Sequence, residues 1–380
     1  MKKLTVIIVL LVLAACAAVG FSDAIDDSNA ASGGTEVKID PKEIIFEHLG
    51  DAYGWEMPFA HHRRIPLPII LIASDGVHCF SSARVAHGHQ YKDGDITFMV
   101  PTEGEYKGKC VEVQPDGQIL KPWDISITKN VLALFLSAMV VLLICFSLVR
   151  WYKRHGFTAP VGMLGFLELI VCFVYEGVVK STLGKNARRF APYLLTVFMF
   201  IFIMNLLGLV VIFPGGANLT GNIAVTMVLA LITFFITNIF GTKHYWKDIF
   251  WPDVPLWLKF PLPIMPVIEL FGIFTKPAAL TVRLFANMMG GHMIVIVLTL
   301  LIFIFTMMCG VAVGGATAVV SIAFSVFMLL IDVLVSFIQA YVFTMLSTIF
   351  ISLAQEEGEH EHEKHEQHEL AKLTPETAEK

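Results

Sequence analysis

The stretch TKPAALTVRLFANMMGGHM, residues 275–293, has membrane-spanning character yet carries an arginine, Arg283, near its middle. An arginine at the centre of a bilayer helix costs about 2.5–3.5 kcal/mol on insertion scales. Charged residues at that depth mark ion or substrate pathways far more often than they serve packing. Arg283 is therefore the first candidate functional residue. The rest of the chain has to indicate which group it interacts with.

The composition is that of a polytopic membrane protein. Of the 380 residues, 56% are hydrophobic and 16% are charged, and the mean hydropathy is +0.70. These values lie outside the range of a soluble domain of this length. The sequence has no P-loop, zinc-peptidase, serine-hydrolase or kinase motif, and no basic run interleaved with aromatic residues. We therefore expect no soluble catalysis, no cofactor and no nucleic-acid partner.

The N-terminus has the pattern of a secretory signal peptide over residues 1–21, with a short basic segment, an apolar run and small residues. The tetrapeptide LAAC, which ends at Cys16, also fits a lipoprotein signal. Two alternatives stay open: lipidation of Cys16, or ordinary cleavage a few residues further on.

Residues 22–125 are predicted to form a small, partly β exported region, because turn formers separate short alternating runs. Cys79 and Cys110 fall in this region, where a disulfide is chemically allowed, but the sequence does not decide whether they pair. Its histidines fit no standard zinc spacing, so we predict surface histidines and no metal. They are His61, His62, His78, His87 and His89.

Five transmembrane helices are predicted from apolar runs long enough to cross a hydrocarbon core of about 30 Å. A further helix over residues 160–189 is less uniformly apolar, and we place it at the cytoplasmic-side interface. Residues 355–380 form an acidic, histidine-rich tail that we predict to be solvated. The five predicted spans cover residues 130–150, 192–213, 223–240, 266–305 and 317–353.

The loops predict the orientation in the membrane. Lysines and arginines follow the first and third spans, whereas the segments PGGANLTG and GVAVGGA carry none. By the positive-inside rule the basic loops are cytoplasmic, so the N-terminus is exported and the C-terminus is cytoplasmic. The signal peptide predicts the same orientation independently. We expect a multi-pass protein of the bacterial inner membrane.

The last two spans are too long for a perpendicular crossing. At about 1.5 Å per residue, a helix over 266–305 would extend about 60 Å, twice the hydrocarbon thickness. Only a short link around CGVAVGG separates it from the helix over 317–353. We therefore predict a steeply tilted antiparallel hairpin in an all-α polytopic membrane protein, with the partly β exported region in front of it.

The first helix of this hairpin places Glu269, Lys276, Arg283 and Asn287 near one face. The same face carries small residues, which permit close approach of another helix. Arg283 is predicted to address that neighbour. The alternative is that Arg283 only neutralises a carboxylate of its own chain.

His292 and Asp332 are the other candidates of the hairpin. His292, nine residues after Arg283, points to about the opposite side of the first helix. Asp332 shares a face of the second helix with Gln339. A buried carboxylate needs a partner, and His292 is the nearest titratable group in an antiparallel hairpin. The pair is interpreted as a proton relay, with a purely structural pairing as the alternative.

The segment PVIELFGIFTKPAALTVRLFANMMGGHMI closely resembles the signature helix of subunit a of F-type ATP synthases, in the Fo membrane sector. The segments FIMNLLGLV and PGGANLTGNIAVTMVLALITF resemble the preceding hairpin of that family, and SFIQAYVFTMLSTIFISLA resembles its last helix. The likeness covers roughly Val131 to Glu357 and leaves the region before Val131 uncovered.

The resemblance implies a proton-translocating stator subunit, which makes no ATP itself. Its hairpin would pack on a ring of c subunits, whose membrane carboxylates are reached by two half-channels. Arg283 would face the ring and separate the half-channels, with Asn287 and Gln339 beside it and Glu269 at the cytoplasmic exit. Subunit b of the peripheral stalk, the other F1Fo subunits and membrane lipid are the further partners that it implies.

Two features depart from the family pattern. Many bacterial relatives carry Glu at the position of His292 and His at that of Asp332, so that acid and imidazole are exchanged here. We predict that this pair lines the outer half-channel. The other candidate lining consists of Asn205, Asn218 and Asn222. The long exported region is the second departure.

Two other functions were weighed. A secondary transporter would use intramembrane charges for coupling but should show internal repeats, which are absent from these unequal spans. A structural or assembly protein would leave Arg283, Asn287 and Asp332 without a purpose. Between H⁺ and Na⁺ the proton is the default, since the selecting carboxylate would lie on the ring.

Overall fold

The computed structural model describes residues 50–56, 64–85, 89–94, 96–101, 106–114, 119–209, 219–250, 264–309 and 311–355. The predicted signal peptide, Cys16, and the tail beyond Gln355 lie outside these residues. As far as it is described, the chain forms two compact units. The first contains Met1–Phe146, Phe202–Gly221 and Asn287–Phe337, and the second contains Ser147–Ile201, Asn222–Ala286 and Ile338–Lys380.

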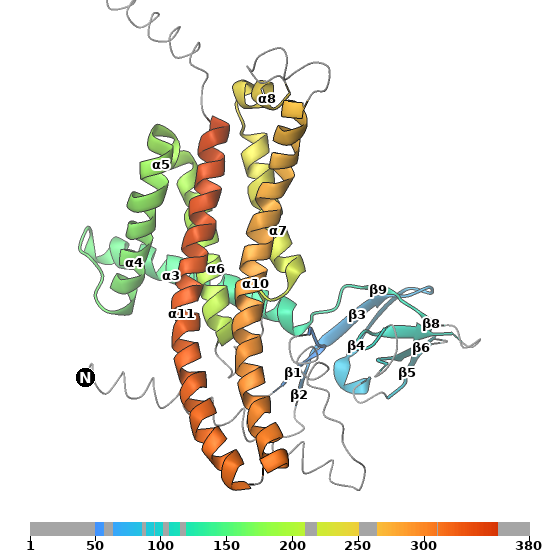
Figure 1. Ribbon diagram of the computed structural model, residues 1–380. Coiled ribbons are helices and arrows are strands. Elements are labelled where there is room, and N and C mark those ends of the chain that lie inside the picture. Colours follow the sequence, from blue (N-terminus) through green and yellow to red (C-terminus); the bar gives the residue numbers. More distant parts are fainter. Residues whose placement is uncertain are drawn as a thin grey trace, which may run out of the picture. The chain divides into compact units, whose positions relative to one another are not determined.

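Short antiparallel strands occupy the first unit where the sequence predicts a partly β region (Figure 1). β1 pairs with β2, β3 lies between β4 and β9, and β5 to β8 follow one another in a four-stranded sheet. The strands are β1 (Gly54–Glu56), β2 (Arg64–Pro66), β3 (Pro68–Ile72), β4 (Val77–Ser81), β5 (Tyr91–Asp93), β6 (Ile96–Met99), β7 (Val111–Val113), β8 (Ile119–Leu120) and β9 (Trp123–Asp124).

This β region has a hydrophobic core of its own. Successive side chains of a strand point to opposite faces, and β3 accordingly turns Ile69 and Leu71 inward, where both are fully buried. Hydrophobic residues of the other strands and turns pack around them. The cluster consists of Ile69, Leu71, Phe80, Val85, Ile96, Phe98 and Cys110.

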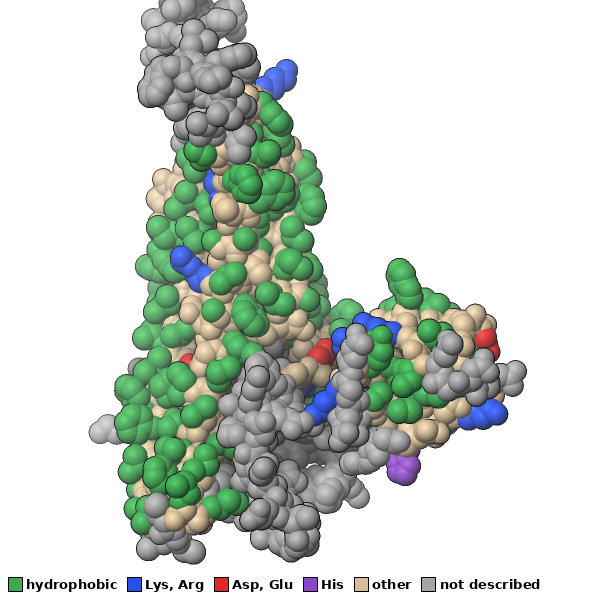
Figure 2. All heavy atoms as spheres, turned by 45° about the vertical axis from the view of Figure 1, so that its right-hand side comes forward, with side chains coloured by type: hydrophobic (Ala, Val, Ile, Leu, Met, Phe, Trp, Pro, Cys, Tyr) green, Lys and Arg blue, Asp and Glu red, His purple; other side chains and the backbone are tan. Residues whose placement is uncertain are grey.

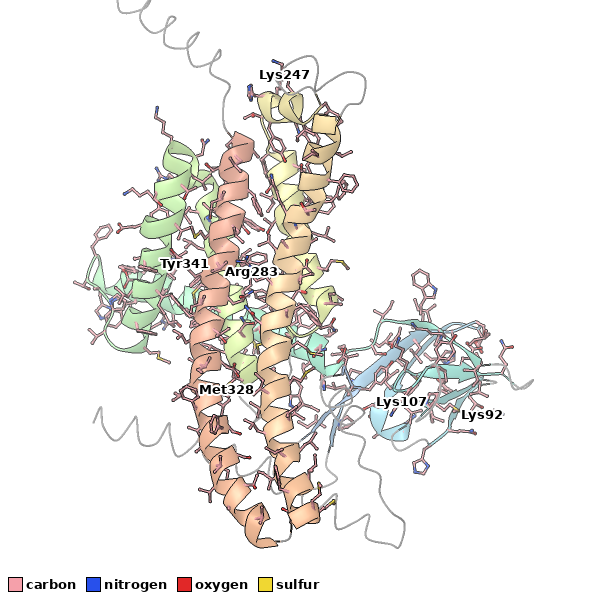
Figure 3. The ribbon with its side chains drawn as sticks, viewed as in Figure 1. Lys92, Lys107, Lys247, Arg283, Met328 and Tyr341 are labelled. Atoms are coloured by element: carbon pink, nitrogen blue, oxygen red, sulfur yellow. The ribbon has the colours of Figure 1, made fainter. Side chains whose placement is uncertain are left out.

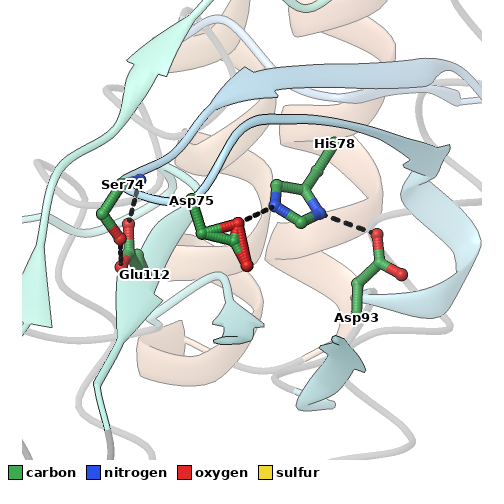
Figure 4. Close-up of polar contacts among 5 residues, drawn as sticks. All are labelled: Ser74, Asp75, His78, Asp93 and Glu112. Atoms are coloured by element: carbon green, nitrogen blue, oxygen red, sulfur yellow. Dashed lines mark hydrogen bonds and ion pairs between the residues drawn. The ribbon is translucent and has the colours of Figure 1, made fainter. Parts of the chain in front are cut away.

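His78 is not the surface histidine that the sequence predicts. Its side chain is only 12% exposed, because the alternation of β4 turns it inward against the ring of Phe98. Figure 4 shows it between two carboxylates: Nδ1 lies 2.9 Å from Oδ2 of Asp93, and Nε2 lies 3.6 Å from Oδ1 of Asp75. Among the residues that the structure describes, no cluster of three or more His, Cys, Asp or Glu could hold a metal ion.

Glu112 is a second buried polar residue of the β region. Its carboxylate accepts hydrogen bonds from the Ser74 hydroxyl at 2.5 Å and from the Ser74 backbone N–H at 3.4 Å (Figure 4). These bonds offset the cost of burying the carboxylate. They tie β7 to the turn between β3 and β4.

The two cysteines of the β region do not form a disulfide. Both are free thiols, with Cys79 exposed on β4 and Cys110 buried beside β7. Burial raises the pKa of the Cys110 thiol to about 12. Because the thiolate is the reactive form, Cys110 is inert at neutral pH.

The described part of the chain has four helical stretches long and apolar enough to cross a membrane. They are Lys129–His155, Met163–Leu209, Leu270–Met308 and Val313–Gln355. Helix α7 (Ile223–Ile239), in the place of the third predicted span, is apolar but has only 17 residues. Hydrophobic side chains cover much of the surface of the helical part in Figure 2. The chain is therefore a mostly helical, multi-pass membrane protein.

The segment predicted as one interfacial helix is divided in the structure. It contains α4 (Met163–Val174), a π-helical turn (Tyr175–Lys180) and α5 (Ser181–Leu183). Gly184 has a φ of 51°, where the absence of a side chain permits a change of chain direction. A 3₁₀ turn then leads into α6 (Ala187–Leu209). Val179 and Leu183 share a buried cluster with residues of α6, so the chain folds back on itself here.

The last two helices are longer than predicted. Helix α10 (Ile264–Cys309) and helix α11 (Val311–Gln355) leave only residue 310 between them, and Gly314 and Gly315 of the predicted link are helical. In hydrocarbon every backbone N–H and C=O needs an internal partner, which favours continued helix over an open loop. The two helices run side by side and antiparallel (Figure 1).

Contacts within each unit establish the register of this α10–α11 hairpin. In the first unit, Gly291 lies against Asp332, and Gly314 lies against Thr306. In the second unit, the Lys276 ammonium lies 5.4 Å from the ring centroid of Phe350. Helix α3 (Lys129–His155) precedes all of these elements, and the short helix α8 (Lys243–Phe250) follows α7.

Candidate functional site

Arg283 lies about midway along α10 and is exposed (Figure 3). An adjacent side of the same helical stretch is buried, with Leu280 at 2% and Leu284 at 0% exposure. Ala279 and Ala286 are exposed near Arg283. The helix therefore packs on its leucine side and presents the arginine on a surface of small residues, as the helical spacing predicts.

Within the described part of the chain, the Arg283 guanidinium forms no ion pair and no hydrogen bond. The alternative that it neutralises a carboxylate of this chain thus finds no partner among those residues. Glu269 belongs to α10, but its side chain lies outside the described part. A guanidinium presented in this way is suited to an acidic group on another chain.

The two polar neighbours predicted for the arginine differ in burial. Asn287, one turn further along α10, is exposed, whereas Gln339 on α11 is buried with an exposure of 4%. Gln339 thus faces the interior of the subunit. Only Asn287 shares the exposed side of Arg283.

Helix α11 also carries a buried stripe of small hydroxyl residues that the sequence analysis did not single out. The Ser336 hydroxyl donates to the backbone carbonyl of Asp332 at 2.7 Å, and the Thr344 hydroxyl donates to that of Ala340 at 2.9 Å. Hydroxyls that bond four residues back satisfy themselves within one helix. Such residues look neutral in a hydropathy plot, although their steps of eight, three and one residues, which keep them within about 120° around a helix, could have revealed a shared face. The stripe consists of Ser336, Thr344, Ser347 and Thr348.

His292 and Asp332 lie at the same level of the hairpin, as predicted for an antiparallel pair. The Asp332 carboxylate packs directly on Gly291: a Cβ at that glycine would lie 2.7 Å from Oδ1 of Asp332. The Nε2 atom of His292 is buried and has no hydrogen-bond partner among the described residues. The structure contains no His292–Asp332 hydrogen bond within those residues, so the predicted relay lacks a direct link.

The asparagines proposed as the other outer lining have structural partners. Asn205 is buried at 1% exposure, and its Oδ1 accepts a hydrogen bond of 2.8 Å from the Thr220 hydroxyl. Asn222 is the N-cap of α7, with Oδ1 accepting from the backbone N–H of Ala224 at 3.0 Å. Asn218 lies outside the described residues.

The second unit contains a small, mostly apolar cavity that the sequence analysis missed, and several polar side chains contribute to its lining. Lys276 of α10 lines it together with Thr233, Thr237 and Asn238 of α7 and Tyr245 of α8. The Tyr245 hydroxyl donates to Oδ1 of Asn238 at 3.4 Å. Phe350 of α11 also lines it, so the residues that form it come from four separate helices, which no local sequence pattern can combine.

Comparison with known proteins agrees with this arrangement. A family model described as ATP synthase A chain matches residues 131–352, and a second, described as a domain of unknown function, matches residues 44–129. The chain is 39% identical over 309 residues to ATP synthase subunit a of Pelodictyon phaeoclathratiforme, with 77% of this chain and 85% of the relative covered.

Two further relatives give similar values. ATP synthase subunit a 2 of Chlorobium luteolum is 44% identical over 250 residues, which cover 63% of this chain and 68% of the relative. ATP synthase subunit a of Myxococcus xanthus is 40% identical over 245 residues, which cover 62% of this chain and 75% of the relative. With more than half of its residues matched by the family model, and with the exposed arginine on its long helical hairpin, the chain belongs to the ATP synthase A chain family.

Proposed function

We propose that Arg283 is the residue through which this subunit couples proton flow to rotation of a c-subunit ring. As a member of its family the chain is the proton-translocating membrane subunit of Fo, and it is not an enzyme by itself. It works with other subunits of the F1Fo complex. The c ring and subunit b of the peripheral stalk are the partners that we assign to it, in the bacterial inner membrane with an exported N-terminus.

The proposal rests on the guanidinium of Arg283. It is exposed on a face of small residues, and it has no hydrogen-bond or ion-pair partner among the described residues. A fixed cation there favours the ionised form of an approaching ring carboxylate and so promotes release of its proton. It also repels protons that would pass directly from one half-channel to the other. Each charge that crosses releases about 2.3 kcal/mol per 100 mV, so several protons are needed for each ATP.

We assign the remaining polar residues of the hairpin to the proton path. Asn287 lies on the exposed side of Arg283 and would contact the passing carboxylate, with Gln339 opposite on α11 and Glu269 at the cytoplasmic exit. His292 and Asp332 would line the outer half-channel. Their common level supports this, and a bridging water would supply the link that no direct bond provides.

The two other candidate functions lose their basis. A secondary transporter and an assembly protein both leave unexplained why an arginine is presented to a neighbouring chain within a family of ATP synthase subunits. We retain neither of them.

The test is Arg283→Ala in the assembled complex. We expect ATP-driven proton pumping in inverted membrane vesicles to fall to background. The content of all subunits should be unchanged, because the side chain forms no hydrogen bond or ion pair in the described part of its own chain. Arg188→Ala, at an exposed arginine outside the hairpin, is the matched control and should pump normally. Substantial pumping by Arg283→Ala at normal subunit content would refute the assignment.

A further inference from the structure

One sheet face of the β region is apolar, and no described residue covers the most exposed of its side chains. Strands β3, β4 and β9 form a three-stranded antiparallel sheet, in which Ile72 is the direct partner of both Val77 and Trp123. These three side chains are 41%, 69% and 79% exposed, respectively. Ile125, which follows β9, is 59% exposed. We call this surface the outer face of the β3–β4–β9 sheet.

The outer face differs in composition from the rest of the surface. Because residues alternate between faces, the inner positions of β3 are the buried Ile69 and Leu71, whereas Ile70 and Ile72 belong to the outer face. No charged residue occupies an outer position on these strands. The outer positions are Pro68, Ile70, Ile72, Val77, Cys79, Ser81, Trp123, Ile125 and Ile127.

The same segment leads without interruption into the first membrane helix. The backbone N–H of Ile125 donates to the carbonyl of Ile70 at 3.0 Å, and that of Ile127 donates to the carbonyl of Pro68 at 3.2 Å. Lys129, the first residue of α3, donates to the carbonyl of Ala52 at 3.0 Å. Each step from sheet to helix is therefore anchored to the β region, and Trp123 lies within about 20 Å of the start of α3 along the chain.

The apolar surface also continues along the chain into α3. Val131, Phe135 and Met139 are 38%, 61% and 50% exposed on a helix that is apolar enough to cross a membrane. Exposed apolar side chains on such a helix contact lipid. The outer face thus joins a lipid-facing surface through a short, hydrogen-bonded connection.

We propose that the outer face of the β3–β4–β9 sheet docks on the bilayer surface around the N-terminal end of α3. Tryptophan concentrates at the membrane–water interface, where the indole ring is partly immersed and its N–H stays wet. For an apolar patch next to a membrane helix, the bilayer surface is a binding partner that is always present. Lys121, which is exposed two residues before Trp123, adds a cation that lipid phosphates would attract. The face would hold the exported region against the membrane.

Trp123 itself is the probe for this proposal. The assembled complex is reconstituted in vesicles that contain phosphatidylcholine brominated on its acyl chains, and the emission of the Trp123→Phe complex is subtracted from that of the wild type. The difference isolates one of the six tryptophans of the chain. Trp123→Tyr serves as a second subtraction partner, should the phenylalanine variant assemble poorly.

The matched control is Lys92→Trp in the Trp123→Phe background, since Lys92 is exposed on β5 of the other large sheet (Figure 3). We expect brominated lipid to quench Trp123 emission at least twofold and aqueous iodide to leave it nearly unchanged, with the opposite result for the control. Equal quenching of both positions by iodide would overturn the proposal. Protection of Trp123 from both quenchers would overturn it as well, because a protein surface would then cover the face.

Discussion

Arg283 and Asp332 illustrate two different ways in which single residues of the hairpin are positioned. Arg283 extends from an exposed face and depends on α10 only for its direction, whereas the Asp332 carboxylate is held by contact with Gly291. The first position should therefore tolerate changes in its surroundings. The second should respond to a single added methyl group.

Gly291→Ala tests the position of the Asp332 carboxylate. The new Cβ would lie 2.7 Å from Oδ1, so the carboxylate must rotate away from α10. Because it is the flexible end of a side chain, we expect assembly to be retained and proton pumping in inverted vesicles to slow several-fold. Gly315→Ala, where a Cβ meets nothing within 4 Å, is the control and should pump normally. Normal pumping by both variants would show that the location of Asp332 is immaterial.

A swap of acid and base tests whether His292 and Asp332 act together. If they form one unit, His292→Glu combined with Asp332→His should recover more activity than either single change. Coupled residues deviate from additivity by about 0.5–3 kcal/mol. Pumping rates, corrected for subunit content, give the coupling energy. Strict additivity of the three variants would mean that the two residues act independently.

At the scale of elements, the tip of the hairpin depends on a close helix–helix contact. A Cβ at Gly314 would collide with the Thr306 side chain and lie 3.0 Å from the Thr306 Cα, so the backbone itself must move. Gly314→Ala should therefore lower the stability of the subunit by about 1–3 kcal/mol, as overpacking does. It should also lower the amount of assembled subunit. Gly315→Ala is again the control. Unaltered stability of Gly314→Ala, measured by thermal aggregation in detergent, would contradict a tight tip.

The elements also show how much of the fold the sequence predicts. Hydropathy and helical spacing predicted the two long helices, their antiparallel pairing and the exposed arginine face, because these depend on local periodicity. They ended the first helix too early, at residue 305, and began the second too late, at residue 317, since the glycines around the link are read as loop formers while a membrane interior favours helix. The fold-back at Gly184 was missed because it depends on one residue with a positive φ, which neither hydropathy nor helical spacing indicates.

For the candidate site, the sequence likewise predicted what depends on a single helix and missed what depends on contacts between elements. The position of Arg283 follows from one helix alone. The cavity beside Lys276 and the contact between Gly291 and Asp332 depend on side chains from different elements. Such contacts join residues that are far apart in the sequence, so no local pattern predicts them.

On the scale of the whole molecule, two family matches meet at the start of α3. Residues 44–129 belong to one match and residues 131–352 to the other. The relative with 77% coverage is aligned to more of this chain than residues 131–352 alone contain, so the likeness to that ATP synthase subunit extends beyond its membrane part. The β region, which lies within the first match, has a separate hydrophobic core and contains neither Arg283 nor any other residue that we assign to the proton path.

Deletion of residues 44–127 behind an intact signal is therefore expected to leave passive proton conduction through Fo in place. The deletion removes the β region together with its core, so that no cut strand is left unpaired, and it retains α3 from its first residue. The measurement is proton leak in vesicles stripped of F1, with subunit content determined in parallel. A deletion of residues 64–85, which cuts through β2, β3 and β4 and leaves β9 without a partner, is the control for a damaged domain and should lower subunit content. If the clean deletion assembles to wild-type levels and yet conducts no protons, the β region is part of the proton path. The boundary of the conducting part would then have to move from α3 into the exported region.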